Sequence, residues 1–492
     1  MAIPTFSSQS SSASSTETPL AETGRGTLGA GVQPITTGDA PSRQGKALLA
    51  SAHPWMVAIG FLGIQFAWAL QMGQVSPLLE RLGSVPWLTS LIWAAGPVTG
   101  VLVQPIVGVL SDRHTSPWGR RRPFLAVGTL MVALSLIIMP NAAAIGAALS
   151  TWVSPLLGQF GMSATAVEAF PFGLLIAAML LWVLDASINI TQGPYRALVP
   201  DVFDTAKQTQ TFSLMSLTIG LGSIAAFLIG FALTNVTTLF YLGAAVMVVF
   251  MGLTVLTTPE EPILKNAESN STPNTPLWAS IVQGCQLTHN QWWLCLSHSA
   301  TWFGLMCLFI FFSVHVPKAV FGATNSASAV YQQGVQWASL GFAALNGVCF
   351  LIAPFMNGWS RQFGPKAVHS VALILMAISL TGLSLFQQPW MTLGCMALMG
   401  IGWATTLSLP FTMVARDVPK GQEGILMGVF NIFVAAPGVL CSVLVGPAIS
   451  RLNAHEDLAF LLGAGAMIVA FALLQRFQWS HTASATSSAT VS

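Results

Sequence analysis

Charged side chains are scarce in this chain of 492 residues. Asp, Glu, Lys and Arg together make up 7% of it, against about a quarter of an ordinary soluble domain. Hydrophobic residues make up 53%, and the mean hydropathy is +0.69. These values exclude a soluble globular protein and predict a membrane protein with many spans. The net charge is only +2 and the basic residues are scattered, which excludes nucleic acid as a partner.

Motifs of catalysis and metal binding are also missing. The cysteines form no CxxC pair and have no histidine at ligand spacing, so we interpret them as core residues and expect no metal site. No catalytic triad or phosphate-binding loop occurs, and we therefore expect neither an enzyme nor a cofactor. The six cysteines are Cys285, Cys295, Cys307, Cys349, Cys395 and Cys441.

Long apolar segments are abundant. From Pro54 onward, segments of about 20 residues recur, each long enough to cross the hydrocarbon core of a bilayer. Between the third and fourth segments, residues 146–170 predict a moderately apolar connection with a short interfacial helix. The twelve predicted spans are residues 55–79, 87–110, 123–145, 171–199, 209–234, 238–257, 292–316, 334–357, 367–387, 390–414, 424–449 and 458–477.

The spans divide the chain into five parts. Residues 1–46 are rich in Ser, Thr and Gly and lack hydrophobic periodicity, so we expect a disordered cytoplasmic tail. We expect an N-terminal half at 47–257, a central cytoplasmic loop at 258–290, a C-terminal half at 291–478 and a cytoplasmic tail at 479–492. The predicted fold is an all-α membrane protein with twelve transmembrane helices in two halves of six.

The distribution of basic residues predicts the orientation. With both termini in the cytoplasm, the inner segments hold 14 Lys and Arg residues, whereas the outer loops hold only Arg81, Lys318 and Arg451. Such an excess is typical of the cytoplasmic side of a membrane protein.

The two halves resemble each other in sequence. The stretch PYRALVPDV at 194–202 recurs as PFTMVARDV at 410–418, at the ends of the fourth and tenth spans. Transporters with internal repeats bind their substrate near the midplane, between the halves. Because Ile401 stands at the position equivalent to Asp185, we expect the ionisable chemistry in the N-terminal half.

The fourth span carries a polar stripe. Asp185, Asn189, Gln192 and Arg196 are spaced so that their side chains share one face of a helix. A low-dielectric environment favours the neutral form of a carboxyl group, so Asp185 is the candidate for the group that binds and releases a proton. The alternative is a structural Asp held by a hydroxyl or an amide.

Arg196 lies about 16 Å along the helix axis from Asp185, too far for a direct bond. We expect it either to pair with an acid such as Asp201, Asp417 or Glu423, or to anchor the helix at the interface.

The loop between the second and third spans joins an acid to several arginines. In GVLSDRHTSPWGRRRPF, residues 108–124, the carboxylate at the end of one span can pair with an arginine at the start of the next. We interpret this group as a gate, and plain anchoring by basic residues is the alternative. The gating candidates are Asp112, Arg113, Gly119, Arg120, Arg121 and Arg122.

This loop resembles the signature of the major facilitator superfamily, and its longer insert ending in RRRP is similar to the sucrose/proton symporter family. Residues 63–83, 95–108 and 184–198 strengthen the resemblance, and 400–411 is a weaker match. The resemblance implies two pseudo-symmetric six-helix halves. It also implies a proton site at Asp185 and a role for Arg196 in transport. Plant members carry a histidine associated with sucrose binding where this chain has Pro86.

Uncharged polar and aromatic side chains are candidates for sugar binding, because sugar sites combine hydrogen-bonding groups with flat apolar surfaces. Each could instead form an interhelical hydrogen bond or lie at the interface. The candidates are Gln65, Trp68 and Gln71 of the first span, Asn189 and Gln192 of the fourth, and Trp403 and Asn431 of the C-terminal half.

Together these features predict a secondary active transporter that works by alternating access. We expect proton-coupled symport of sucrose, of another disaccharide or glycoside such as maltose, or of glucose, into the cytoplasm. The expected partners are the sugar, the proton and the lipid bilayer, and we expect a monomer in the plasma or bacterial inner membrane. The alternatives are an uncoupled sugar facilitator and an exporter of a different small solute.

Overall fold

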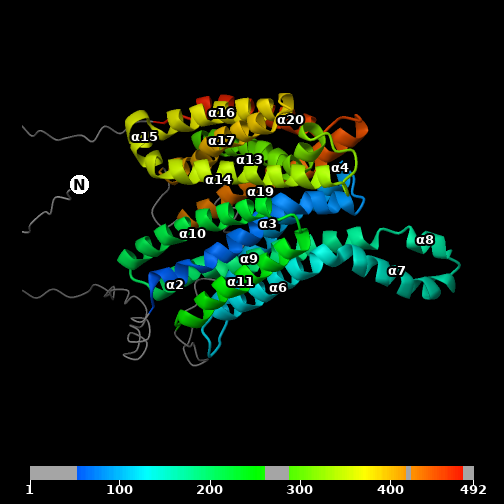
Figure 1. Ribbon diagram of the computed structural model, residues 1–492. Coiled ribbons are helices and arrows are strands. Elements are labelled where there is room, and N and C mark those ends of the chain that lie inside the picture. Colours follow the sequence, from blue (N-terminus) through cyan, green and yellow to red (C-terminus); the bar gives the residue numbers. More distant parts are fainter. Residues whose placement is uncertain (1–51, 261–286, 417–422, 480–492) are drawn as a thin grey trace, which may run out of the picture. The chain divides into compact units, whose positions relative to one another are not determined.

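The computed structural model describes residues 52–260, 287–416 and 423–479, without the side chains of 423–428 (Figure 1). These residues belong to one compact unit. The predicted tail at 1–46, most of the central loop and all but the first residue of the C-terminal tail lie outside the described part. The division of the chain into five parts therefore stays a prediction.

The described residues form helices and no strand. The N-terminal half holds α2 (Pro54–Ala58), α3 (Gly60–Arg81), α4 (Pro86–Ile92), α5 (Ala95–Arg113), α6 (Arg122–Ile138), η1 (Met139–Asn141), α7 (Ala142–Gly158), α8 (Ala164–Glu168), α9 (Phe172–Val202), α10 (Thr205–Ala232) and α11 (Val236–Thr257). The C-terminal half holds α13 (His289–His315), η2 (Val316–Val320), α14 (Ala329–Ile352), η3 (Ala353–Phe355), α15 (Met356–Phe363), α16 (Pro365–Leu385), α17 (Pro389–Thr406), α18 (Leu409–Ala415), α19 (Glu423–Arg451) and α20 (Asp457–Arg476).

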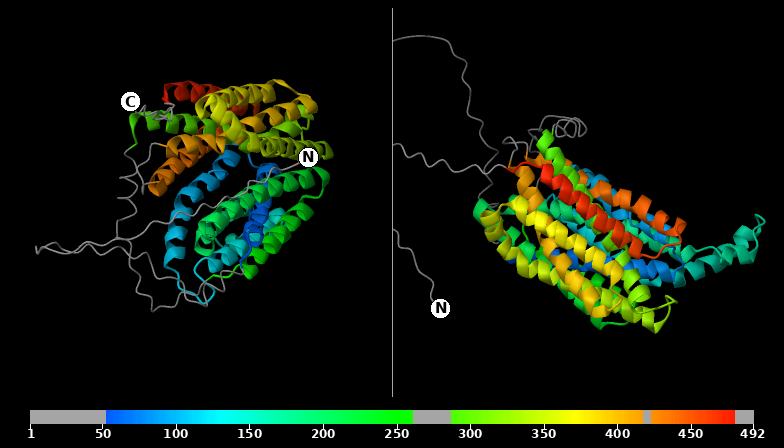
Figure 2. Two further views of the ribbon diagram at one scale, coloured as in Figure 1. Left: turned by 90° about the vertical axis from the view of Figure 1, so that its left-hand side faces the viewer. Right: turned by 90° about the horizontal axis from the view of Figure 1, so that it is seen from above.

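Twelve helical segments of the described chain are long and apolar enough to cross a membrane. Each overlaps one predicted span, so the prediction of a twelve-span, all-helical membrane protein is confirmed. Six spans precede the central loop and six follow it. Figure 2 (left) shows the two groups of helices facing each other. They meet mainly where α10 packs on α14 and α4 packs on α19.

The third span is longer than predicted. Instead of a connection with a short interfacial helix, the structure has α7, a helix of 17 residues that continues α6 through the turn at Pro140. The Ala-rich start of α7 is a strong helix former. Together α7 and α8 project beyond the bundle as a hairpin (Figure 1).

Several helices begin at side chains that cap them. Asp204 accepts a hydrogen bond from the backbone N–H of Lys207 in α10. Asn235 and Ser328 accept the equivalent bond from the third residue of α11 and of α14. Thr288 and Gln291 form a capping box at the start of α13. These bonds satisfy backbone donors that a helix leaves free at its N-terminus.

Glycines let helices within each half approach backbone to backbone. A Cβ at Gly222 of α10 would lie 2.6 Å from the carbonyl oxygen of Leu62 in α3, and one at Gly400 of α17 would lie 2.4 Å from that of Leu345 in α14. Small residues at such contacts are typical of membrane helices.

The internal sequence repeat has two different local structures. The fourth span continues as one helix to Val202, through Pro194 and Pro200. In the tenth span the helix is interrupted between Thr406 and Leu409, where α17 ends and α18 begins.

Candidate transport site

Asp185 is buried in the middle of α9, with 4% of its surface exposed. Its Oδ1 accepts a hydrogen bond of 2.9 Å from Nε2 of Gln71 in α3, whereas its Oδ2 has no partner. Gly96 of α5 faces this free oxygen, since a Cβ there would lie 3.6 Å from it. A buried carboxylate without a cation is costly, and the described residues offer it only one amide donor. The free Oδ2 is the atom at which a proton would remove that charge.

Asn189 lies one turn further along and joins α9 to α5. Its Nδ2 donates to the carbonyl oxygen of Asp185 at 2.9 Å and to Oγ1 of Thr99 at 3.0 Å, and its Oδ1 accepts from Nε2 of Gln104 at 2.7 Å. The amide is fully engaged in this network. The sequence did not single out Thr99 or Gln104, although Gln104 is an uncharged polar residue inside an apolar span.

Arg196 is exposed, and its guanidinium lies 5.9 Å from the centre of the Phe61 ring. That ring stacks on Tyr195 at 4.6 Å. Of the three acids considered as its partner, Asp201 pairs elsewhere, Asp417 lies outside the described residues, and the side chain of Glu423 is not described. Within the described part of the chain Arg196 makes no ion pair. Gln192 is half-buried between these two levels of the stripe.

The three candidates of the first span point to three different helices. Gln71 bonds to α9, Gln65 donates to Oγ of Ser223 in α10 at 3.4 Å, and Trp68 meets Phe309 of α13. Steps of three residues turn a helix by about 300° each, so Gln65 and Gln71 lie about 120° apart. The two amides therefore lie on either side of Trp68 around the helix and do not form one binding surface with its ring.

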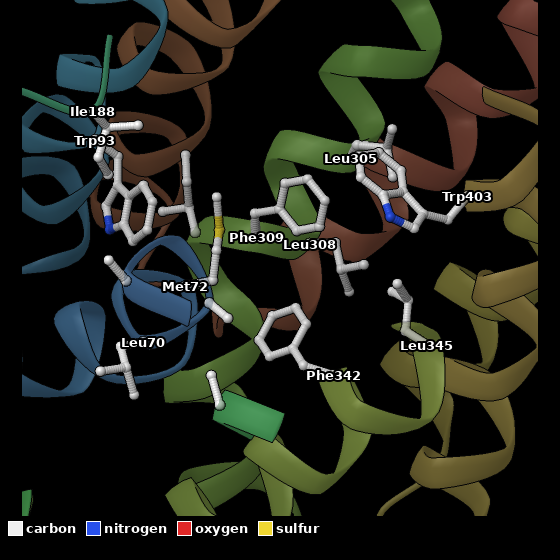
Figure 3. Close-up of a cluster of buried hydrophobic side chains, with 14 of the residues drawn as sticks. Leu70, Met72, Trp93, Ile188, Leu305, Leu308, Phe309, Phe342, Leu345 and Trp403 are labelled. Carbon is white, nitrogen blue, oxygen red and sulfur yellow. The ribbon is translucent and has the colours of Figure 1, made fainter. Parts of the chain in front are cut away.

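An aromatic layer fills the middle of the bundle between the two halves. Phe309 lies edge-on to Trp68 at 6.0 Å and to Trp403 at 5.6 Å, and Phe342 stacks on Phe227 at 5.1 Å. Figure 3 shows Phe309 and Phe342 in the centre of this cluster, with Trp403 beside them. Trp403 is buried in the layer, edge-on to Phe309 and to Trp302.

Asn431 is exposed on α19. The other sugar-binding candidate of the C-terminal half, Trp403, is buried.

Polar contacts join the two halves at the end of the bundle where α3 stops and α14 starts, here called the outer end. Nζ of Lys318 lies 2.7 Å from Oε1 of Glu80 in the N-terminal half and 2.7 Å from Oε1 of Glu456. The hydroxyl of Tyr331 donates to Glu80 at 2.5 Å, and Arg81 donates to Gln332. A cavity of only about 20 Å³ remains beside Glu80 and Lys318.

More bonds between the halves lie just below this cluster. Oγ of Ser76 donates to the carbonyl oxygen of Ile310 at 2.8 Å, and Nε2 of Gln74 donates to Oγ of Ser339 at 3.2 Å. Together with the aromatic layer they close the outer end of the bundle.

The predicted gating loop forms a cluster of arginines and acids. Arg120 makes a bidentate pair with Asp201 at 2.6 and 3.2 Å, and Nε of Arg121 lies 2.9 Å from the same carboxylate. Arg121 also reaches Asp112 at 2.5 Å and Oγ of Ser111 at 2.6 Å. The loop thus ties the ends of α5, α6 and α9 together.

Glu260, which follows α11, completes this cluster. Its carboxylate accepts hydrogen bonds of 2.9 to 3.2 Å from the backbone N–H groups of Arg120, Arg121 and Arg122 at the start of α6. Burial raises the pKa of this carboxyl group, and the backbone hydrogen bonds act in the opposite direction. Gly119 is required here, because φ is +93° and a Cβ would lie 2.3 Å from Oε2 of Glu260.

The contacts described for this cluster remain within the N-terminal half. Arg113 is exposed beside it. The sequence missed Glu260, which falls inside the predicted central loop and carries no local sign of its role.

Five of the six cysteines lie in the described part of the chain, and all five are free. Cys295, Cys307, Cys395 and Cys441 are buried, and Cys349 is half-buried. The sulfur atoms of Cys307 and Cys441 lie 3.7 Å apart, within hydrogen-bond distance, without forming a disulfide. The described residues contain no group of side chains that could hold a metal ion. Cys285 lies outside them.

The fold and the buried polar groups define a membrane transporter. The family model of the Major Facilitator Superfamily matches residues 160–442. The chain therefore belongs to this superfamily, and it is a multi-pass membrane transporter rather than an enzyme.

Among known proteins, the chain is similar to sucrose transport protein SUC4 of Arabidopsis thaliana, with 27% identity over 447 residues that cover 82% of this chain and 85% of the relative. It is also 27% identical to sucrose transport protein SUT2 of Oryza sativa subsp. indica, over 83% of this chain and 89% of the relative.

Two solved structures share the fold. A variant of the nucleoside transporter NupG gives a TM-score of 0.66 at 14% identity, covering 86% of this chain and 99% of the other. A bacterial homologue of the lysosomal transporter Spinster gives 0.58 at 12% identity, covering 89% and 98%.

Proposed function

We propose that this protein is a proton-coupled symporter that carries a sugar into the cytoplasm. The observation that carries the proposal is Asp185, a buried carboxylate to which the described residues give one amide donor and no cation, so that Oδ2 has no partner among them. The similarity to sucrose transport proteins favours sucrose, or another disaccharide or glycoside such as maltose, or glucose, as the substrate.

In this mechanism a proton from outside binds Oδ2 of Asp185 and neutralises it. The neutral site then binds the sugar through side chains of α3 and α9, for which Gln65, Trp68 and Gln192 are the candidates. Protonation removes the cost of a buried charge, so the loaded carrier changes state more readily than the ionised empty carrier. Release of the sugar and the proton inside resets the site.

Arg196 lies on the same face of α9 toward the inner end. Its guanidinium over Phe61 makes no ion pair within the described residues and is available for a hydroxyl group of the sugar. We propose that it acts in the release pathway, while the cluster of Asp112, Arg113, Gly119 and Arg120 to Arg122 holds the inner ends of the N-terminal helices during the conformational change.

The closed outer end is inconsistent with the outward-open state of alternating access. We propose further that both termini lie in the cytoplasm, that the protein is a monomer, and that it resides in the plasma membrane or bacterial inner membrane. The excess of basic residues in the inner loops supports this orientation.

Uptake into vesicles tests the proposal. Labelled sucrose, maltose and glucose are offered with an imposed inward proton gradient, with and without an uncoupler, to wild type, D185N and E168Q. Glu168 is an exposed acid on α8, so E168Q is a matched control for the loss of one carboxylate. We expect accumulation that the uncoupler abolishes, with D185N inactive in accumulation and E168Q like wild type.

Uptake that only equilibrates would support the uncoupled facilitator, and normal accumulation by D185N would refute the role of Asp185. Efflux of another solute without sugar uptake would support the exporter.

A further inference from the structure

The C-terminal half carries a groove on the surface that faces lipid. The main contacts of α16 are with α15, α17, α18 and α20 of the same half. The rest of its surface is apolar and exposed, including Val371 at 59% and Ile378 at 55%. In a bilayer this face of α16 meets lipid.

The deeper part of the groove is a hollow of about 430 Å³ between α15, α16 and α17. Its volume lies in the range of small-molecule sites, roughly 300 to 1,000 Å³. Apart from Thr405, the side chains that line it are apolar. They include Trp359, Phe363, Val371, Leu375 and Ile401.

A second hollow of about 440 Å³ adjoins the first and shares Phe363, Ala367 and Val371 with it. This part is polar and lies at the end of the bundle, where Lys366, Ser370, Gln475 and Trp479 line it. The two hollows therefore form one groove with an apolar and a polar end.

Lys366 is held in place at the polar end. Its Nζ donates to the carbonyl oxygen of Phe477 at 2.7 Å and to that of Gln475 at 3.1 Å. Because an ammonium group has three donors, one remains for a ligand. Nε2 of Gln475 donates to Oγ of Ser370 at 3.0 Å and to the carbonyl oxygen of Phe471 at 3.4 Å, so Lys366 is the group of the polar end that keeps a donor for a ligand.

The charge around the rim is positive. Arg361 at the end of α15 and Arg476 at the end of α20 are both exposed. The segments that form the groove, residues 356–385, 389–406 and 471–479, contain no Asp or Glu. An anion is therefore favoured at this end of the groove and a cation is not.

The length of the groove matches one leaflet of a membrane. From Lys366 to Leu375 the helix rises by about 14 Å, and half of the hydrocarbon core is about 15 Å. Trp479 lies at the polar end, where tryptophan is typical of the membrane interface.

We infer that this groove binds one anionic glycerophospholipid. The phosphate lies against Lys366, the glycerol lies near Trp479, and one acyl chain fills the apolar hollow beneath α15. Basic pockets at the ends of membrane helices are typical sites for anionic head groups. The inference is independent of the transported substrate, and only the assignment to the cytoplasmic leaflet rests on the orientation proposed above.

Native mass spectrometry of the purified full-length transporter tests this inference. Phosphatidylglycerol and phosphatidylcholine with the same acyl chains are titrated separately against wild type, K366Q, V371W and K207Q. Lys207 is an exposed lysine at the inner end of α10 in the other half, so K207Q is the matched control for the loss of one charge.

We expect one phosphatidylglycerol to bind wild type and K207Q about five- to tenfold more tightly than phosphatidylcholine. K366Q should lose this preference. V371W should weaken both lipids, because the indole fills the apolar hollow.

Equal binding of the two lipids by wild type, or equal effects of K366Q and K207Q, would overturn the inference. Competition by glycerol phosphate as strong as that by the lipid would indicate a phosphate site instead. If K366Q fails to fold, V371W decides, because undiminished phosphatidylglycerol binding by that variant also excludes a lipid in the groove.

Discussion

The contacts at the outer end predict how the balance between the two states of the carrier can be shifted. Glu80 belongs to the N-terminal half, and its carboxylate makes an ion pair with Lys318 at 2.7 Å and accepts a hydrogen bond from Tyr331 at 2.5 Å, both in the C-terminal half. The substitution E80Q keeps the shape and removes the charge. It should therefore weaken the contact between the halves without unfolding either half.

The size of the effect follows from the burial of the pair. The side chain of Glu80 is 20% exposed and that of Lys318 is 33% exposed. An exposed ion pair contributes about 0.2 to 1 kcal/mol, and loss of one partner of a buried pair costs about 3 to 5 kcal/mol. An intermediate loss of about 1 to 2 kcal/mol shifts the equilibrium toward the outward-open state about 5- to 30-fold.

Labelling from outside measures this shift. Thr89 is 6% exposed and lines the small outer cavity, so T89C is shielded from a membrane-impermeant maleimide while the outer end is closed. In a background without the six native cysteines, E80Q should raise the labelling rate of T89C about 5- to 30-fold. R451Q removes an exposed charge at the outer end of α19 and should leave the rate unchanged. Equal rates in E80Q and R451Q would refute the assignment of Glu80 to the closure of the outer end.

Three further predictions concern the cluster at the inner end of the N-terminal half. G119A should reduce the free energy of unfolding by about 1 to 3 kcal/mol and so lower the melting temperature. G108A should leave the melting temperature unchanged, because a Cβ at Gly108 has open space. Equal melting temperatures of the two variants would contradict the close contact at Gly119. D201N should destabilise by about 1 to 3 kcal/mol, since it leaves two arginines without their shared acid, which is 20% exposed. D204N should be nearly neutral because Asn caps a helix as well as Asp does, and a D204N loss equal to that of D201N would argue against this account. Because burial raises the pKa of Glu260 in the folded protein, the folded state binds that proton more tightly than the unfolded chain, and its contribution to stability falls as pH rises above about 4.3. The melting temperature of wild type minus that of E260Q should therefore decrease with rising pH. An increase would show that the folded protein lowers the pKa of Glu260 instead of raising it.

The twelve spans could be predicted because each is a continuous apolar run, and the requirement to satisfy backbone hydrogen bonds in lipid leaves helices as the solution. Asp185 could be found for a related reason, because a single acid in such a run stands out. The extent of α7 could not be predicted from the sequence. Its sequence is as apolar as a span, but whether an Ala-rich segment after a proline continues a helix or turns onto the interface depends on what it packs against.

The partners within the site were beyond the reach of the sequence. Gln71 and Asp185 are 114 positions apart, and Glu80 and Tyr331 are 251 apart. No local spacing records such pairs, because they depend on which faces of separate helices meet. The spacing of Asp185 and Asn189 predicts that they share one face of α9. It does not indicate that the side chain of Asn189 forms hydrogen bonds with Thr99 and Gln104 of α5.

The hairpin of α7 and α8 has a practical consequence for imaging this transporter. A protein with almost no mass outside the bilayer gives particle images few features for alignment. α7 alone extends for about 26 Å. Trp152 within α7 and Phe160 just after it are 86% and 79% exposed. A rigid antibody fragment raised against this hairpin would add an asymmetric marker at a known position, away from the surfaces where the two halves move against each other.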